Sequence, residues 1–294
     1  MSAKACPQTW LRFRVGHERH DRDLLTDAAW AQLAPLLPPQ KPRTGRPAKP
    51  HRPVVEGILW ALRTGAPWRD LPERFGPWHT VASRFSRWVA AGVWDGVLAA
   101  LQRRADLAGA LDWRTHFVDG TVIRAHQHAA GARKRTRRRP PAGPADEALG
   151  RSRGGFSTKL HLRAEGGGKP MVLLVTAGQR HEQTAFRPLM ERGAIKRRGR
   201  GRPRVRPQRV VGDKGYTGRP IRAYCRRRGI RATIPRLRTE RPARRFDRAA
   251  YRERNRVERL VGRLKQCRRV ATRYEKRAVH FLAMVTLAAI LLWL

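Results

Sequence analysis

Cysteine is scarce in this chain: Cys6, Cys225 and Cys267 are the only three among 294 residues. They lie far apart and never in C-x-x-C spacing, which argues against a disulfide framework and against a cysteine zinc site. Residues 1–20 lack an apolar core segment, so we expect no signal peptide. These absences favour a location in a reducing cytoplasm.

Long apolar runs are also missing. The last segment, Phe281 to Leu294, has almost no polar side chain but covers only 14 residues. A membrane-spanning helix needs about 20 such residues, and shorter runs are more often core helices. We therefore predict a buried C-terminal helix and no membrane association.

Acidic residues are few, with 22 Asp and Glu against 65 Lys and Arg, which leaves a net charge of +43. Self-repulsion of this size needs counter-charge, and the usual polyanion is nucleic acid. A membrane surface is the weaker alternative, because no basic amphipathic helix flanks a true membrane span. Apolar residues make up 40 % of the chain, which favours a folded protein of roughly one to two domains.

The first third of the chain is predicted to be helical. Residues 1–24 show no clear periodicity and are interpreted as a mobile basic lead. A helical domain is expected over residues 25–108, with Gly/Pro turns between its helices. The predicted helices cover residues 25–37, 54–63, 68–75 and a further one capped by Thr80.

The helix after Thr80 has apolar residues on one face and a polar, basic opposite face with Arg84 and Arg87. Short helices with tight turns and a basic last helix predict a helix-turn-helix-like DNA-binding module. A plain helical bundle with a solvated face remains the alternative.

From residue 112 the pattern changes to an α/β one. Short strands are predicted at 116–118, 159–162, 171–175, 210–211 and 230–234, and helices at 183–191, 220–228 and from 247 onward. Gly166 to Gly168 predict a hairpin between the second and third strands. This order is that of a ribonuclease-H-like fold, a mixed sheet with flanking helices, over residues 112–294. Basic loops are expected at 131–154 and 194–209.

Two of the scarce acidic residues directly follow short apolar strands, Asp119 after Val118 and Asp213 after Gly212. If the two strands are neighbours, the carboxylates lie close together and repel unless a proton or a cation lies between them. Hard divalent cations with oxygen ligands are the natural bridge in a protein that binds phosphodiesters. Each aspartate alone could equally be a turn-former.

A third carboxylate comes from the C-terminal helix. Tyr251, Arg254, Glu258 and Lys265 fall within a stripe of about 60° on a continuous helix. Glu253 is about 140° away from Glu258, so Glu258 is preferred. The simpler reading of Glu258 is an ion-pair partner for a neighbouring arginine.

The spacing Y-x2-R-x3-E-x6-K at Tyr251 to Lys265 resembles the glutamate-helix signature of bacterial insertion-sequence DDE transposases. The stretches FVDGTVIRAHQHAAGA, GGFSTKLHL, VVGDKGYTG and VERLVGRLKQCRRVATRYEK resemble those of insertion-sequence family five, and the match runs from about Leu25 to Leu294. The resemblance implies a ribonuclease-H-like core whose catalytic and metal-binding triad maps onto Asp119, Asp213 and Glu258. It also implies at least a dimer on double-stranded DNA, in the bacterial nucleoid.

The implied activity is DNA transposition: binding of terminal inverted repeats, cleavage at the element ends and joining of the 3′-OH ends to target DNA. We expect two Mg²⁺ ions, with Mn²⁺ as a substitute, because two ions about 4 Å apart can activate the attacking oxygen and stabilise the leaving one. No small-molecule cofactor is needed.

Further residues are expected to contact DNA. The candidates are Lys265, Arg254, Tyr251, Lys159, Lys214, Arg84 and Arg87. His126 and His128 could approach the metal, although a loop role is favoured. Arg133 to Arg139 holds six basic residues in seven, and Arg200 to Pro203 matches the core of an AT-hook only weakly, so both indicate general phosphate contact.

Four other functions fit parts of this pattern. One is a DNA-binding regulator with an inactive core, and another is a nuclease that cuts DNA without joining it. These two differ from a transposase only in which steps of the DNA reaction they catalyse. A structural RNA-binding protein is disfavoured, because no aromatic-rich stacking motif is present. A tyrosine recombinase using Tyr216 or Tyr251 would also need its own Arg/His cluster.

Overall fold

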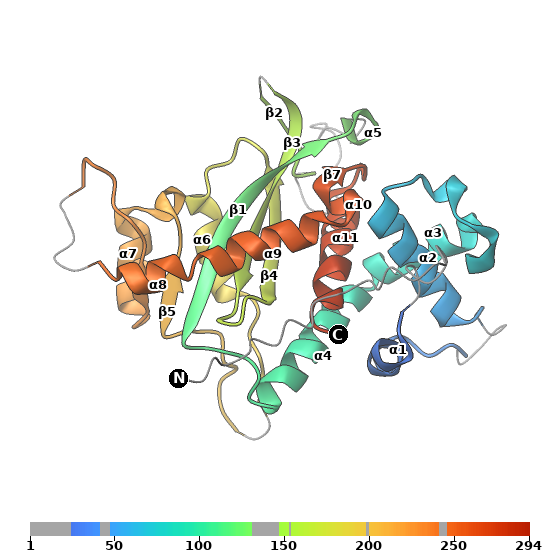
Figure 1. The fold of residues 1–294 in the computed structure, drawn as a ribbon, viewed down its shortest axis with the longest axis horizontal. Helices are drawn as coiled ribbons and strands as arrows, with labels where there is room; N and C mark the ends of the chain where they lie inside the picture. The colour runs from blue at the N-terminus through green and yellow to red at the C-terminus, as the bar shows by residue number, and fades with distance from the viewer. Residues whose placement is uncertain (1–24, 42–47, 131–146, 153, 198–199, 241–245) are drawn as a thin grey trace, which may run out of the picture.

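The computed structural model describes residues 25–41, 48–130, 147–152, 154–197, 200–240 and 246–294 (Figure 1). The predicted basic lead, residues 1–24, lies outside the described residues, and so does the basic run from Arg133 to Arg139.

The N-terminal part is helical, as predicted. Its elements are α1 (Asp27–Leu33), η2 (Ala34–Leu36), α2 (His51–Thr64), η3 (Trp68–Asp70), η4 (Glu73–Phe75), α3 (Trp78–Ala90) and α4 (Val93–Leu107). Two local predictions are wrong. The helix expected over 68–75 is two separate 3-10 turns, because Pro72 lacks an N–H and disfavours helical backbone at Leu71. Helix α3 begins at Trp78 behind Pro77, two residues before the predicted cap at Thr80.

The rest of the chain forms one sheet with flanking helices. Its strands are β1 (Thr115–Ala125), β2 (Gly150–Ser152), β3 (Gly155–Ala164), β4 (Pro170–Ala177), β5 (Arg209–Val211), β6 (Arg231–Thr233) and β7 (Thr272–Arg273). Its helices are α5 (Gln127–Ala130), α6 (Gln183–Glu191), η5 (Lys214–Tyr216), α7 (Arg219–Arg227), α8 (Arg248–Arg252), α9 (Asn255–Lys265), α10 (Arg268–Ala271) and α11 (Ala278–Leu291).

The sheet order is β2-β3-β1-β5-β6, with β4 on β3 and β7 on β1. Strands β1, β3 and β4 pair antiparallel, whereas β5 and β6 run parallel to β1. Three antiparallel strands followed by parallel strands with crossover helices are the ribonuclease-H-like arrangement, so the predicted fold class is confirmed.

The predicted hairpin between β3 and β4 is present, and its turn is held by one carboxylate. Gly168 adopts a left-handed φ of 86°, which favours glycine. The buried Glu165 accepts hydrogen bonds from the backbone N–H groups of Gly167 (2.7 Å), Lys169 (2.8 Å) and Asp112 (3.1 Å). The hairpin is therefore tied to the segment that leads into β1.

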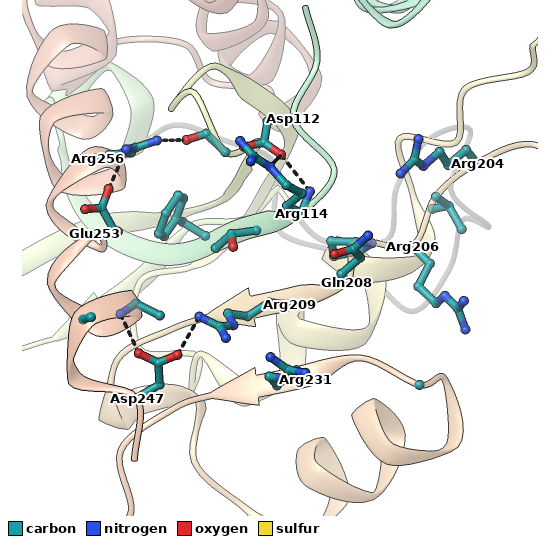
Figure 2. A pocket seen from close by; sticks show the side chains of 18 of the residues that line it. Asp112, Arg114, Arg204, Arg206, Gln208, Arg209, Arg231, Asp247, Glu253 and Arg256 are labelled. Atoms are coloured by element: carbon teal, nitrogen blue, oxygen red, sulfur yellow. Dashed lines mark hydrogen bonds and ion pairs between the residues drawn. The ribbon is translucent and has the colours of Figure 1, made fainter. Parts of the chain in front are cut away.

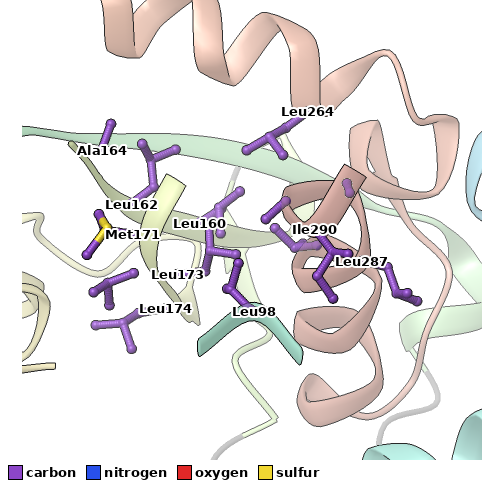
Figure 3. Close-up of a cluster of buried hydrophobic side chains, with 14 of the residues drawn as sticks. Leu98, Leu160, Leu162, Ala164, Met171, Leu173, Leu174, Leu264, Leu287 and Ile290 are labelled. Carbon is purple, nitrogen blue, oxygen red and sulfur yellow. The ribbon is translucent and has the colours of Figure 1, made fainter. Parts of the chain in front are cut away.

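One apolar core runs through both parts of the chain. In Figure 3, Leu98 of α4 lies between the β3–β4 leucines and the side chains of Leu287 and Ile290 on α11. The Nε1 of Trp293, just past α11, also donates to the carbonyl of Pro170 at 2.8 Å. The predicted buried C-terminal helix is thus confirmed. Within the described ranges, no helix is long and apolar enough to cross a membrane.

Candidate active site

Strands β1 and β5 bring the two candidate aspartates together. Phe117 pairs with Val211 in parallel register, and Asp119 and Asp213 each follow two residues later. The predicted neighbourhood of the two strands is therefore confirmed. The predicted strand end at Asp119 is wrong, because β1 continues to Ala125 by pairing with β3 and then with β7. The apolar pattern stops early because β1 becomes more exposed beyond Val118.

Asp213 is held by its own turn. Strand β5 ends at Val211, as predicted, and the Oδ1 of Asp213 accepts the backbone N–H of Gly215 at 2.9 Å, capping η5. Tyr216 is buried beneath this turn, and burial together with the charges of three nearby carboxylates raises its pKa well above the usual value.

A third carboxylate at this place, Glu182, was not predicted. It is the N-cap residue of α6, and its Oε1 lies 3.5 Å from the Nζ of Lys159 on β3. It packs on two glycines that follow the aspartates: a side chain at Gly120 would meet Glu182 Oε1 at 3.2 Å, and one at Gly215 would overlap its Oε2. Its position before the predicted helix, among so few acidic residues, was the only available signal.

The carboxylates perturb one another. Burial raises the pKa of Asp119 to about 6, and the negative charges of Asp213 and Glu182 act in the same direction. The backbone N–H of Gly120 and the guanidinium of Arg254 oppose this shift. A carboxyl whose ionised form is disfavoured by burial and by neighbouring negative charges is a group that a bound cation would stabilise.

The candidate Glu258 is connected to Asp119 by an arginine that contacts both carboxylates. Arg254 pairs with Glu258 and lies 3.8 Å from Asp119 Oδ1. Glu258 itself is half exposed. Glu253 turns elsewhere and pairs with Arg256 at 2.6 Å. This geometry favours Glu258 over Glu253 as the acidic partner of the two aspartates.

The predicted continuous helical stripe is wrong in detail. Tyr251 belongs to α8 and Glu258 to α9, and the junction at Glu253 and Arg254 interrupts the helix. Backbone hydrogen bonds there span three residues, as from Arg254 N to Tyr251 O at 3.0 Å. Such a turn is tighter than an α-helix, so a uniform rotation of about 100° per residue does not carry across it.

Carboxylate oxygens, which this site offers, are the donor type that a hard divalent cation prefers. Three carboxylates, Asp119, Asp213 and Glu182, gather at one place, and the guanidinium of Arg254 lies between Asp119 and Glu258 where a positive charge is favoured. Among the described residues, no group of three or more His, Cys, Asp or Glu side chains is arranged to hold a metal ion. Glu258 would have to leave Arg254 to join such a group.

Of the predicted DNA contacts, several surround this site. Lys265 donates to Thr121 Oγ1 at 2.7 Å on the strand that carries Asp119, while Lys214 is exposed beside Asp213. Lys159 is half-buried against Glu182, and Tyr251 lies under Arg254, 5.8 Å from its guanidinium carbon.

The two arginines predicted on the exposed face of α3 differ. Arg87 is exposed, but Arg84 is buried, which corrects the prediction. Its guanidinium hydrogen-bonds to His51 Nδ1 at 2.9 Å and lies over the Trp88 ring. The helical pattern placed Arg84 with the polar residues, but α2 covers that part of α3.

His126 and His128 lie away from the carboxylates. Their rings meet edge to face with centroids 4.5 Å apart, and His126 also packs on Tyr274. Asp119 is six residues from the end of β1, which is roughly 20 Å along an extended strand. The favoured loop role holds only for His126, because His128 lies in the short helix α5.

Family models match most of the chain. Residues 114–293 match the family described as "Transposase DDE domain". Residues 25–98 match the family described as "Putative transposase of IS4/5 family". The match over residues 25–98 covers the helical part, and the match over residues 114–293 covers the sheet with its carboxylates.

The similar proteins include a transposase of an insertion element. Protein y4sN of Sinorhizobium fredii, described as uncharacterized, is 41 % identical over 39 % of this chain and 86 % of its own length. The "Putative transposase for insertion sequence element IS402" of Burkholderia cepacia is 32 % identical over 48 % of this chain and 62 % of its own length. Among solved structures, the Mos1 transposase paired-end complex with the left transposon end matches with 11 % identity and a TM-score of 0.24, over 75 % of this chain and 80 % of that one.

Proposed function

Because the chain belongs to the DDE-domain transposases of insertion elements, we propose that it binds the double-stranded terminal repeats of its own element, cleaves DNA there by metal-dependent hydrolysis and joins the 3′-OH ends to target DNA. One observation carries the proposal most: Asp119 and Asp213 follow paired positions of neighbouring parallel strands, and Arg254 links Asp119 to Glu258.

The family implies a divalent metal ion, and Mg²⁺ is proposed, with Mn²⁺ as a substitute. Asp119, Asp213 and Glu258 are the residues that would hold it, most simply as two ions. Bound there, the metal supplies Lewis-acid stabilisation of the attacking and leaving oxygens at phosphorus. Asp119 lies on β1 with its side chain 14 % exposed, and the scissile phosphate is proposed to bind beside it.

Arg254 has a separate role in the free protein. It neutralises Asp119 and Glu258 when no other cation does so, which limits repulsion among the buried carboxylates. Once Glu258 leaves it, the guanidinium becomes available to a phosphate oxygen of the DNA. Lys265, held beside Asp119 by Thr121, is the second phosphate contact proposed at the site.

The helical part is proposed to recognise the terminal repeats. Helix α3 carries the exposed Arg87, and α2 packs against it to form the two-helix unit expected of a helix-turn-helix-like module. Two element ends must be held together for joining, so the proposed working unit is at least a dimer on DNA.

A strand-transfer assay with the element's own ends and Mg²⁺ tests this function. Asp119→Ala, Asp213→Ala and Glu258→Ala should each abolish cleavage while binding to the ends is largely kept, and Glu253→Ala should still cleave. Binding by the unaltered protein without any cleavage would identify a DNA-binding regulator instead. Cleavage without joined product would identify a nuclease.

A further inference from the structure

A second feature of the fold is a large basic pocket beside the active site. It has a volume of about 1060 Å³ and is lined by the starts of β1, β5 and β6, the segment from Pro203 to Gln208, and the α8–α9 junction (Figure 2). Six arginines line it: Arg114, Arg204, Arg206, Arg209, Arg231 and Arg256. Pockets for small apolar ligands are mostly hydrophobic, so this lining argues for an anionic ligand.

Half of these arginines are neutralised within the protein. Arg114 pairs with Asp112 at 3.1 Å, Arg209 with Asp247 at 2.8 Å and Arg256 with Glu253 at 2.6 Å. Figure 2 shows Arg209 beside Arg231 on neighbouring strands, with Asp247 bound to Arg209.

The other half keep their charge for a ligand. In the described part of the chain, no carboxylate lies within the 4.0 Å ion-pair limit of Arg204, Arg206 or Arg231. Arg204 lies over the ring of Trp113 and Arg206 donates to the carbonyl of Arg228, so both are held in place without being neutralised. The pocket therefore carries three arginines without an ion-pair partner, although Asp247 and Asp106 act on Arg231 and Arg204 at longer range.

The pocket adjoins the carboxylates along two elements. Thr115 and Phe117 line the pocket, and they lie on the same face of β1 as Asp119 because the three are two residues apart. The pocket therefore comes within roughly 7–13 Å of Asp119 along the strand. At the α8–α9 junction, Glu253 and Arg256 line the pocket while Arg254 faces Asp119. Neighbouring phosphates of one DNA strand are farther apart than their rise of about 3.4 Å along the helix axis, so this distance spans at most about four nucleotides.

We propose that this pocket binds the phosphodiester backbone of the DNA strand that enters the active site, within about four nucleotides of the scissile phosphate. The inference rests on the proposed function, since it places the scissile phosphate at Asp119. Arg204, Arg206 and Arg231 contact the phosphates, and the ion-paired arginines shape the walls. The contacts are to the backbone, so they position the strand without reading its sequence.

The test compares two double variants of the full chain. Arg206→Gln with Arg231→Gln removes two exposed charges from the pocket, and Arg103→Gln with Arg227→Gln removes two exposed charges elsewhere. Binding of a duplex carrying the element end is measured at several NaCl concentrations, and ethylation interference maps the contacted phosphates. Matching thermal melts would show that both variants are folded.

The pocket variant should bind about tenfold or more weakly, because each charged hydrogen bond is lost outright. Its slope of log K against log[salt] should flatten by about 1.8, and interference should vanish only at phosphates within about four nucleotides of the cut. The control should keep the interference pattern of the unaltered protein.

Equal effects of the two variants would overturn the pocket proposal. A second result would also overturn it: the pocket variant keeps the salt slope of the unaltered protein but loses binding to inorganic phosphate, measured by calorimetry. The pocket would then bind a small free anion. These outcomes can be told apart from a failure of the proposed function. If the unaltered protein binds the duplex but never cuts it, the proposed function is wrong, and the binding assay still tests the pocket.

Discussion

Glu182 packs closely on Gly215, so the start of α6 and the turn after Asp213 should be energetically coupled. A methyl group at Gly215 would overlap Glu182 Oε2 and lie 3.0 Å from Asp213 Oδ1. Gly215 is not among the glycines with positive φ, so alanine fits its backbone. The whole cost of Gly215→Ala therefore falls on the neighbouring carboxylates.

The magnitude follows from what Glu182 would lose. Moving it breaks its pairing with Lys159, whose side chain is 13 % exposed while that of Glu182 is 20 % exposed. Breaking a fully buried pair costs about 3–5 kcal/mol and an exposed one about 0–1 kcal/mol, so an intermediate cost of about 1–3 kcal/mol is expected. In a Glu182→Ala background the overlap is gone and only the 3.0 Å approach to Asp213 Oδ1 remains. Gly215→Ala should then be close to neutral, because a gain of about 0.4–1 kcal/mol through the unfolded chain offsets that approach.

Urea unfolding of the two single variants and the double variant measures this coupling. We expect the cost of Gly215→Ala to differ by at least about 1 kcal/mol between the two backgrounds, beyond the scatter of independent sites. Lys159→Met serves as a control, because it should remove most of the cost of displacing Glu182. Additive effects of Gly215→Ala and Glu182→Ala would refute the packing argument.

Three further predictions address the site and the core. Glu258→Gln should reduce cleavage by at least 100-fold, on the order expected for loss of an essential charged group, whereas Glu253→Gln should cleave within a fewfold of the unaltered protein; the reverse ranking would contradict the geometry at Arg254. His116 is fully buried, and burial holds its pKa well below 6.5. As the pH falls, the unfolded chain therefore binds a proton at His116 before the folded protein does. The free energy of unfolding should drop by about 2 kcal/mol between pH 7 and pH 5 for this reason. His116→Phe should remove that part of the pH dependence in urea unfolding, and an unchanged dependence would assign it to other groups. Arg163 is fully buried and donates to three backbone carbonyls, so Arg163→Met should destabilise by about 2–4 kcal/mol in the same assay, and a loss below about 1 kcal/mol would show that the carbonyls find other donors.

Several features of the protein could be predicted because they depend on neighbours along the chain. The strand-loop-helix order and the buried C-terminal helix follow from local apolar patterns, which the structure reproduces in α6, β5 and α11. The family resemblance rests on short motifs around Asp119, Asp213 and Glu258, and residues 114–293 match the transposase DDE domain family. Local patterns were sufficient here because each motif is contiguous.

Features that depend on contacts between distant segments could not be predicted. Arg84 sits on the polar side of its helix by sequence, yet α2 buries it against His51. Strand β1 continues beyond Asp119 because β3 and β7, far away in the chain, provide hydrogen-bond partners for residues whose own pattern is no longer apolar.

The candidate site shows the same division. Sequence alone determined which scarce acidic residues follow apolar strands and which glutamate the helical signature selects. Tertiary structure alone placed Glu182 against Gly120, 62 residues earlier in the chain, and turned Glu253 toward the basic pocket while Arg254 faces Asp119. The physical reason is that a carboxylate's role depends on the charges and backbone within a few ångströms, and those come from segments whose distance in sequence carries no signal of their contact.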